Sequence, residues 1–129
     1  MSTVVIDASA ILAAILGEAG GDSVFDVLDE AIVSTVNVAE VYTYAAINVL
    51  PTEAIDAFFS DVAIEIAPFD QVQAVTAGQL AGLTRKAGLS LGDRSCLALA
   101  KLCDAEVLTA DRAWEQVADV VGLTITLLR

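Results

Sequence analysis

The sequence contains no histidine in its 129 residues. Histidine is the most common general base near neutral pH, and it activates the nucleophile in serine and cysteine hydrolases. Its absence excludes those classes, so any catalysis by this chain must rest on carboxylates or on a metal ion. The only two cysteines, Cys96 and Cys103, lie seven positions apart without a CxxC motif, which fits neither a zinc site nor a disulfide within one helix. We expect both on one helix face as small core residues.

Positive charge is missing from the first two-thirds of the chain. Residues 1–84 hold twelve acidic and no basic residues, whereas residues 85–129 hold six of each, so the net charge of −12 lies in the first segment. Such a surface repels nucleic acid at long range, and a polyanion must approach from the basic side. The basic residues are Arg85, Lys86, Arg94, Lys101, Arg112 and Arg129. The acidity fits either a basic partner or a high-salt cytoplasm.

Long hydrophobic runs and a basic N-terminus are also missing. No apolar stretch reaches the ~18 residues of a membrane span, and no basic patch precedes an apolar run as in a signal peptide. We therefore expect a soluble, cytoplasmic protein with no membrane partner. With 57% hydrophobic residues, the chain is expected to form a single domain over residues 1–129 with its own core.

Short runs of branched apolar residues alternate with longer helical patterns. Strands are predicted at 3–6, 31–36, 63–68, 106–110 and 123–128. Helices are predicted at 8–16, 23–30, 37–50, 52–62, 71–87, 90–104 and 111–120. Helix caps are predicted at Asp22, Asn37, Thr52 and Asp70, and helix ends at Gly17 and Gly88. The alternation predicts an α/β fold with three layers, α/β/α, around a mostly parallel sheet of roughly five strands whose continuous apolar runs are covered on both faces.

Four acidic residues fall near the carboxyl ends of predicted strands, where open α/β sheets bind ligands. Asp7 directly follows the first strand and Asp111 the fourth, whereas Glu40 lies on the first turn of the helix after the second strand. Asp93 begins the helix 90–104. Each acid alone is explained as a cap or first-turn residue, although less readily for Asp7 and Glu40, which adjoin apolar residues. If all four converge, a proton or a divalent cation must relieve their repulsion, and carboxylate oxygens favour Mg²⁺ or Mn²⁺ over zinc.

These acids lie in four short segments, which are VVIDAS, NVAE, LGDRSCLALA and VLTADRAW. In order and spacing, the segments resemble the PIN-domain ribonucleases, and among these the VapC-type toxins of toxin–antitoxin pairs. The resemblance covers nearly the whole chain. It implies an endoribonuclease that hydrolyses single-stranded or looped RNA with Mg²⁺ (or Mn²⁺), a cognate antitoxin with a basic segment, and a homodimer.

The resemblance also implies roles for individual residues. Asp7, Glu40, Asp93 and Asp111 would be both the catalytic and the metal-binding residues. Asp7 and Asp93 would ligate the ion, whereas Glu40 and Asp111 would hold the ion or its waters and accept a proton. Ser9 matches a hydroxyl residue that supports the first acid or a bound water; alternatively it satisfies a backbone N–H in the first helical turn.

Three further side chains have open alternatives. Arg94 and Arg112 each follow one of the four acids, and they hold phosphate, orient the neighbouring carboxylate or only balance surface charge. Trp114 either packs in the core or stacks on an RNA base. Beyond Asp111 no residue matches the additional acid or asparagine of the family, which leaves one or two metal ions open.

Three other functions compete with a nuclease. A PIN fold that binds only RNA or a partner, without catalysis, would keep the same motifs. A receiver-like phospho-acceptor domain also gathers acids around Mg²⁺, but no lysine follows Asp111 as that class requires. A haloacid-dehalogenase-like phosphohydrolase needs a second aspartate where Ser9 stands.

Overall fold

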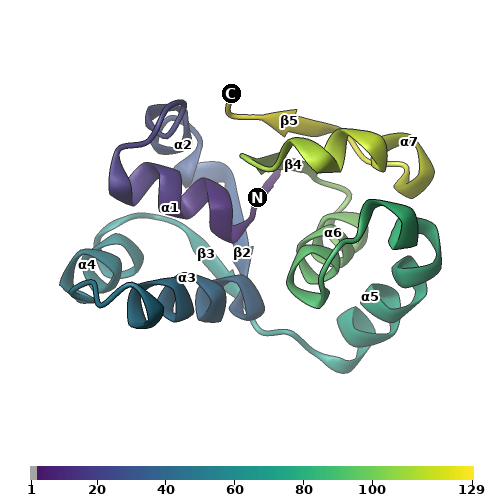
Figure 1. The fold of residues 1–129 in the computed structure, drawn as a ribbon, viewed down its shortest axis with the longest axis horizontal. Helices are drawn as coiled ribbons and strands as arrows, with labels where there is room; N and C mark the ends of the chain where they lie inside the picture. Colours follow the sequence, from purple (N-terminus) through teal and green to yellow (C-terminus); the bar gives the residue numbers. More distant parts are fainter. Residues whose placement is uncertain (1–2) are drawn as a thin grey trace.

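The computed structural model describes residues 3–129, which contain a five-stranded sheet. Its strands are β1 (Val4–Ile6), β2 (Ala31–Ser34), β3 (Glu65–Ala67), β4 (Glu106–Thr109) and β5 (Ile125–Leu127). They lie in the order β3-β2-β1-β4-β5, and each neighbouring pair is parallel. The parallel sheet confirms the predicted α/β class (Figure 1).

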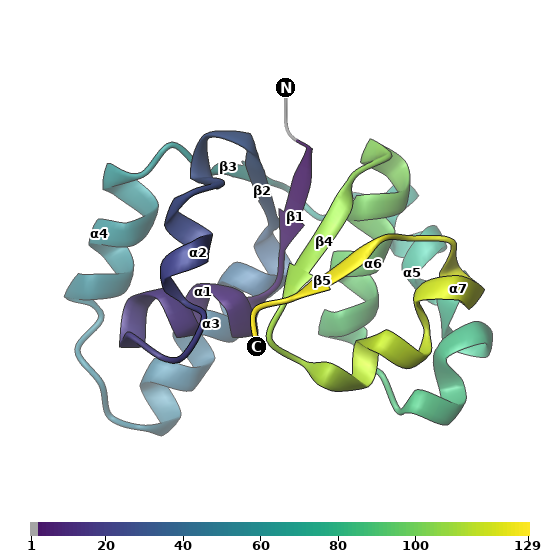
Figure 2. The same ribbon diagram turned by 90° about the horizontal axis from the view of Figure 1, so that it is seen from above.

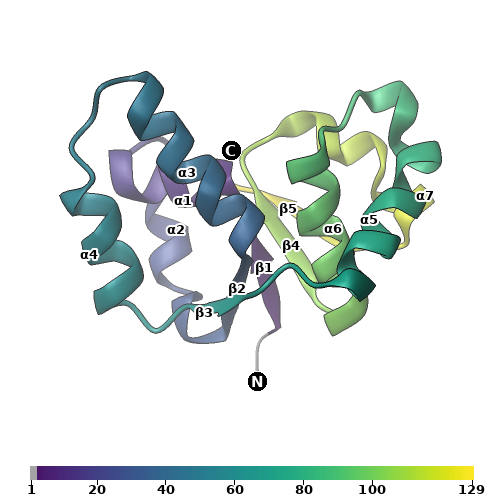
Figure 3. The same ribbon diagram turned by 90° about the horizontal axis from the view of Figure 1, so that it is seen from below.

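Helices cover both faces of this sheet. The α-helices are α1 (Ala8–Leu16), α2 (Asp22–Phe25), α3 (Thr35–Ile47), α4 (Glu53–Asp61), α5 (Gln71–Thr84), α6 (Leu91–Cys103) and α7 (Ala118–Val121). The 3-10 helices are η1 (Leu28–Glu30), η2 (Arg85–Ala87) and η3 (Arg112–Gln116). Figures 2 and 3 show α1 to α4 on one side of the strands and α5 to α7 on the other, which confirms the three layers.

Alternate residues of the central strands supply two separate cores. Val4 and Ile6 of β1 pack into a cluster with α1 to α4, whereas Val5 packs into a cluster with α5, α6 and α7. Because both faces are covered, β1 and β2 are buried along their whole length, as their continuous apolar runs predict. The edge strand β3 differs, since Glu65 and Ile66 are exposed.

Several predicted helix ends are confirmed. The helix 8–16 has the predicted bounds, and Gly17 ends it with a φ of 68° in the left-handed region that glycine adopts without strain. The Asp70 side chain caps α5 by accepting a hydrogen bond from the backbone N–H of Gln73. Gly88, with a φ of 68°, ends the helical segment that α5 and η2 form together.

Two predicted helices are each broken in two. The segment 23–30 forms α2 and η1, and 111–120 forms η3 and α7. Gly21 rather than the predicted Asp22 takes the N-cap position of α2. A Cβ at residue 21 would lie 2.2 Å from the carbonyl oxygen of Ala13, so only glycine fits against α1 there. The tight turn of η3 buries Trp114 completely. Thr52 takes the N-cap position of α4, but its side chain makes no capping hydrogen bond.

The start of α3 corrects the prediction for Asn37. Strand β2 ends at Ser34, and the Ser34 hydroxyl caps α3 by accepting a hydrogen bond of 3.1 Å from the N–H of Val36. The helix therefore begins earlier than predicted, which places Asn37 in its first turn as a buried residue. Glu40 consequently lies in the second turn of α3 and not in the first turn, where it was predicted.

The two cysteines do not share one environment. Both are free, and Cys96 is buried as predicted, but Cys103 is exposed. The prediction of a core residue at Cys103 is wrong because the end of α6 faces solvent, with residues 101–104 all exposed. Within residues 3–129, no helix is both long and apolar enough to cross a membrane.

Candidate active site

The order of the strands creates a switch point between β1 and β4. From β1 the chain builds outward through β2 and β3 on one side, and then through β4 and β5 on the other. Ile6 pairs with Leu108, so Asp7, directly after β1, lies beside Thr109, the last residue of β4. Open α/β sheets bind ligands at such a point.

The Asp7 carboxylate is the buried centre of this edge, with 4% of the residue exposed. Its Oδ1 accepts from the backbone N–H of Ala10 at 2.9 Å, which caps α1. The Ser9 hydroxyl lies 2.8 and 2.9 Å from the two carboxylate oxygens, and the Thr109 hydroxyl donates to Oδ2 at 2.7 Å. Asp7 is therefore a cap and also the acceptor of two hydroxyl groups.

The Ser9 hydroxyl contacts both Asp7 and the segment after β4. Besides approaching Asp7, its hydroxyl oxygen accepts a hydrogen bond of 3.0 Å from the backbone N–H of Ala110. This backbone group belongs to the segment after β4 rather than to the first turn of α1. Ser9 thereby joins the ends of β1 and β4.

Thr109 is a site residue that the sequence analysis missed. Its hydroxyl donates to Asp7 and accepts a hydrogen bond of 3.0 Å from the backbone N–H of Asp111. The signal was the threonine two positions before Asp111 in VLTAD, at the end of a predicted strand. It became meaningful only when β4 proved to be the neighbour of β1.

Glu40 reaches from α3 to the start of α6. The Nδ2 of Asn37 donates to Glu40 Oε1 at 2.7 Å and to the carbonyl oxygen of Gly92 at 3.1 Å. The Glu40 carboxylate lies so close to Gly92 that a Cβ at residue 92 would be 2.2 Å from Oε2. Asn37 is thus a second polar site residue whose place the sequence did not indicate, because it was expected to be a cap.

Asp93 lies in the first turn of α6, as predicted. Its Oδ2 accepts from the backbone N–H of Ser90 at 3.0 Å, and the Ser90 hydroxyl accepts from the N–H of Asp93 at 3.1 Å. This reciprocal pair is a capping box. The box fixes the start of α6 with the Asp93 charge near Asp7 and Glu40.

Electrostatic effects show that three of the four acids share one region. Burial raises the pKa of Asp7 to about 6, although the hydrogen bonds from Thr109, Ala10 and Ser9 lower it, and the Asp93 charge raises it further. Burial of a carboxylate favours its neutral form because charge is poorly solvated in the interior.

Glu40 and Cys96 respond to the same charges. Burial raises the pKa of Glu40, the hydrogen bond from Asn37 lowers it, and the Asp93 charge raises it. The pKa of the Cys96 thiol lies well above its usual value, first because of burial and then because of the charges of Asp7, Asp93 and Glu40. The charges of all three carboxylates therefore reach the same buried side chain of α6.

Asp111 does not join this group through its side chain. Its carboxylate Oδ1 accepts from the backbone N–H of Ala113 at 3.0 Å and so caps η3, and the residue is exposed. Its only described connection to Asp7 runs from its own backbone N–H through the Thr109 hydroxyl. The structure thus brings together Asp7, Glu40 and Asp93, with Asp111 at the margin.

The two candidate arginines contact backbone carbonyl groups. Arg94 donates from Nη1 to the carbonyl oxygen of Ala77 at 2.9 Å, and Arg112 donates from Nη1 to that of Arg129 at 2.9 Å. In the described part of the chain, no lysine or arginine forms an ion pair with any of the four acids. Neither arginine therefore orients its neighbouring carboxylate through an ion pair.

Trp114 has no access to a nucleic-acid base. Its side chain is completely buried among the residues that pack against α5 and α6, with no hydrogen-bond partner for the indole Nε1 in residues 3–129. Of the two alternatives, packing in the core is confirmed.

The acids do not form a closed cage. Over residues 3–129, no three His, Cys, Asp or Glu side chains are arranged to hold a metal ion as they stand. The donor chemistry nevertheless fits a hard cation, since the grouped acids offer only oxygen ligands and have no basic partner.

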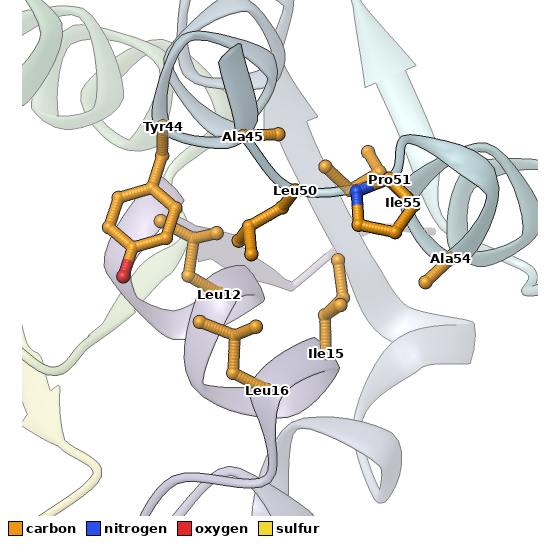
Figure 4. A pocket seen from close by; sticks show the side chains of 9 residues that line it. All are labelled: Leu12, Ile15, Leu16, Tyr44, Ala45, Leu50, Pro51, Ala54 and Ile55. Carbon is orange, nitrogen blue, oxygen red and sulfur yellow. The ribbon is translucent and has the colours of Figure 1, made fainter. Parts of the chain in front are cut away.

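An apolar cavity of about 160 Å³ lies apart from the acids. Figure 4 shows side chains of α1, of α3, of the loop after α3 and of α4 around it. The lining residues are Leu12, Ile15, Leu16, Tyr44, Ala45, Leu50, Pro51, Ala54 and Ile55. Its lining has none of the carboxylates of the candidate active site, so it is a different kind of surface.

Comparison with known proteins identifies the family. Residues 4–120 match the PIN domain, so this chain belongs to the PIN-domain family. Membership excludes the receiver-like and haloacid-dehalogenase-like alternatives. No curated protein matches the chain significantly.

Solved structures share the fold across the whole chain. A DNA-bound VapBC from Salmonella typhimurium is 18% identical, covers 100% of both chains and has a TM-score of 0.77. A toxin–antitoxin complex from Klebsiella pneumoniae is 16% identical, covers 98% of both chains and has a TM-score of 0.72. FitAcB from Neisseria gonorrhoeae is 18% identical, covers 98% of both chains and has a TM-score of 0.75. At these identities the likeness establishes the common fold.

Proposed function

We propose that this chain is a divalent-metal-dependent endoribonuclease that acts in the cytoplasm as the toxin of a toxin–antitoxin pair. The observation that carries the proposal is that Asp7 is buried at the switch point of the sheet with no basic partner among the described residues, while Glu40 packs against the start of α6, where Asp93 lies. If Asp7 had only a structural role, a basic partner or a neutral residue at this position would make the buried site more stable.

The donor set fits Mg²⁺ or Mn²⁺, both of which prefer carboxylate oxygens. When bound, such an ion lowers the pKa of a water molecule and neutralises charge on the phosphate. Asp7 and Asp93 would ligate the ion, whereas Glu40 and Asp111 would hold it or its waters and accept a proton. Ser9 and Thr109 would keep the Asp7 carboxylate in one orientation through their hydrogen bonds.

The proposed substrate is single-stranded or looped RNA. Asp7 is buried at the end of β1, so the phosphate must approach a buried carboxylate. A flexible single strand can bring a phosphate there more readily than a regular duplex. The six basic residues all lie after residue 84, and Arg94 and Arg112 adjoin two of the four acids in the sequence. We assign these two arginines to phosphate binding, for which each would have to exchange its present backbone carbonyl partner.

The proposed partner is a cognate antitoxin with apolar and basic residues. The Salmonella typhimurium VapBC and the Klebsiella pneumoniae toxin–antitoxin complex contain proteins of this fold, which supports an antitoxin as the partner. In this chain, Leu16 and Leu50 line the cavity of Figure 4 and are exposed. Exposed Ile47 and Val49 precede Leu50 in the sequence, and the whole lining falls within the segment that has acidic but no basic residues. An amphipathic basic segment would complement both the apolar lining and the surrounding charge.

A homodimer completes the proposal. The helix α5 has no charged residue in a chain of net charge −12, and Val72, Val75 and Leu83 are exposed on it. An uncharged apolar face is where two copies of an acidic protein can approach with the least repulsion. Light scattering on the purified protein would measure the mass.

The direct test is metal-dependent RNA cleavage. The purified protein is incubated with a fluorescent single-stranded RNA in excess EDTA, and then with Mg²⁺ or Mn²⁺ added beyond the chelator. We expect no cleavage in EDTA and restored cleavage with either ion. Cleavage that resists EDTA would refute the metal requirement, and RNA binding without cleavage under every condition would favour the non-catalytic binding module.

A further inference from the structure

We infer that Asn37 is a positioning residue that clamps the Glu40 carboxylate over Gly92, and so holds Glu40 beside Asp93 before any ion binds. The inference rests on the proposed metal-dependent function, because it concerns how one of the proposed ligands is held. It assigns a purpose to two residues, Asn37 and Gly92, that are neither acidic nor expected to touch the substrate.

The first support is the pair of hydrogen bonds made by one amide nitrogen. Asn37 Nδ2 donates to Glu40 Oε1 at 2.7 Å within α3 and to the carbonyl oxygen of Gly92 at 3.1 Å on α6. Asn37 is 1% exposed, so water has little access to the amide nitrogen that donates both bonds. The amide therefore ties Glu40 to the helix that carries Asp93.

The second support is an acceptor left unused. The Oδ1 of Asn37 is buried and has no hydrogen-bond partner among residues 3–129. Leaving a buried acceptor unpaired is unfavourable. A residue serving only to fill space at this position would avoid that penalty, whereas a residue needed for its two donor contacts must accept it.

The third support is the glycine itself. A Cβ at residue 92 would lie 2.2 Å from Glu40 Oε2 and 2.6 Å from Oε1, so the carboxylate fills the space of the missing side chain. By contrast, a Cβ at Gly78 or Gly82 in α5 would meet nothing within 4 Å. Glycine weakens helices, and at residue 92 the structure gives it a specific reason.

The test compares matched substitutions in the full chain. Gly92→Ala pushes the Glu40 carboxylate away without removing a hydrogen-bonding group, and Gly82→Ala is its control, with the same chemical change in open space. Asn37→Ala removes the clamp, and its control is Asn48→Ala at the other end of α3, which loses one hydrogen bond of 2.8 Å to the Tyr44 carbonyl oxygen.

The primary measurement is Mn²⁺ affinity of the RNA-free protein by isothermal titration calorimetry, with circular dichroism to confirm folding. Loss of a group that orients a metal ligand typically weakens affinity 10- to 100-fold. We expect Asn37→Ala and Gly92→Ala each to bind Mn²⁺ about 10-fold or more weakly, with both controls within about twofold of the wild type. Cleavage of RNA should fall in the same order.

The outcomes separate this inference from the function on which it rests. Wild-type affinity in either Asn37→Ala or Gly92→Ala, while the wild type itself binds Mn²⁺, overturns the clamp and leaves the proposed nuclease intact. Absence of Mn²⁺ binding by the wild type overturns the metal-dependent function, and the clamp with it. If Gly92→Ala does not fold, the affinity of Asn37→Ala alone decides.

Discussion

The hydroxyl of Thr109 donates a hydrogen bond of 2.7 Å to Oδ2 of Asp7, joining two residues that are 102 positions apart in the chain. The contact exists because β4 lies beside β1 in the sheet. It couples the stability of the central strands to the state of one buried carboxylate.

Replacing Thr109 by valine should therefore affect both stability and ion binding. The variant keeps the shape of the side chain but leaves Asp7 with one fewer donor, so the free energy of unfolding should fall by about 1–3 kcal/mol. Loss of this bond also raises the pKa of Asp7 further, because the bond favours the charged form. Mn²⁺ binding, measured against pH, should shift to higher pH.

The control for this variant is Thr84→Val. Thr84 is also buried, and its hydroxyl donates to the Leu80 carbonyl oxygen at 2.9 Å, on a helix that carries none of the four acids. It should lose stability without moving the pH dependence of Mn²⁺ binding. An equal shift in both variants would show that the contact with Asp7 has no special part.

Asp7→Asn tests the central acid directly. The substitution preserves the size of the side chain and removes its charge, so the fold should persist while RNA cleavage falls by roughly 100-fold or more. Circular dichroism and a fluorescent RNA substrate measure the two properties. Cleavage at the wild-type rate would remove Asp7 from the mechanism.

The metal-free protein should lose part of its stability as the pH rises. Burial raises the pKa of Asp7 from 3.8 to about 6, so between these values the folded protein holds a proton that the unfolded chain has released. The folded state is then favoured at low pH, and this contribution falls by up to about 3 kcal/mol as pH passes through 6.

Urea unfolding in EDTA at pH 4.5 and 7.5 measures this effect. Asp7→Asn cannot titrate at residue 7, so the difference between wild type and variant isolates the contribution of Asp7 from all other carboxylates. The wild type should lose stability relative to the variant between the two pH values. A difference that stays constant or grows in favour of the wild type contradicts the buried, proton-binding carboxylate.

Val49 should limit the stability of the free chain while serving the partner surface. Its φ of 54° is strained for a β-branched residue, and it is 89% exposed. Val49→Asn relieves the strain, because asparagine tolerates this region, and should raise the free energy of unfolding by about 1 kcal/mol. It should also weaken binding of the proposed antitoxin, which loses an apolar contact.

Urea denaturation of the free chain and titration with the product of a short neighbouring gene measure these opposite effects. Asp104→Asn is the matched control, since Asp104 has a φ of 52° at the end of α6, outside the proposed partner surface. Unchanged affinity after Val49→Asn would move the partner surface elsewhere.

Local patterns in the sequence were sufficient for most of the fold. The branched run before Asp7 predicted a strand covered on both faces, and Gly17 and Gly88 marked helix ends, because burial and backbone preference act within a few residues. The capping serine of α3 was harder to recognise. Ser34 directly follows the apolar residues of β2, and the next two residues, Thr35 and Val36, fit a strand as well as a helix.

The site was predictable only in part. The spacing of Asp7, Glu40 and Asp93 placed each acid at a strand end or helix start, and the structure packs Glu40 against the first turn of α6, which carries Asp93. Thr109 and Asn37 escaped prediction because their roles depend on which strands and helices become neighbours. That information lies in the strand order, which local sequence patterns do not reveal.

The central position of β1 between β2 and β4 has a consequence during protein synthesis. While the ribosome is still translating the first hundred codons, a nascent chain carries Asp7, Glu40 and Asp93 but lacks the strand whose threonine completes the environment of Asp7. Under the proposed function, the site would thus stay unassembled next to the protein's own message until the final strands emerge from the exit tunnel.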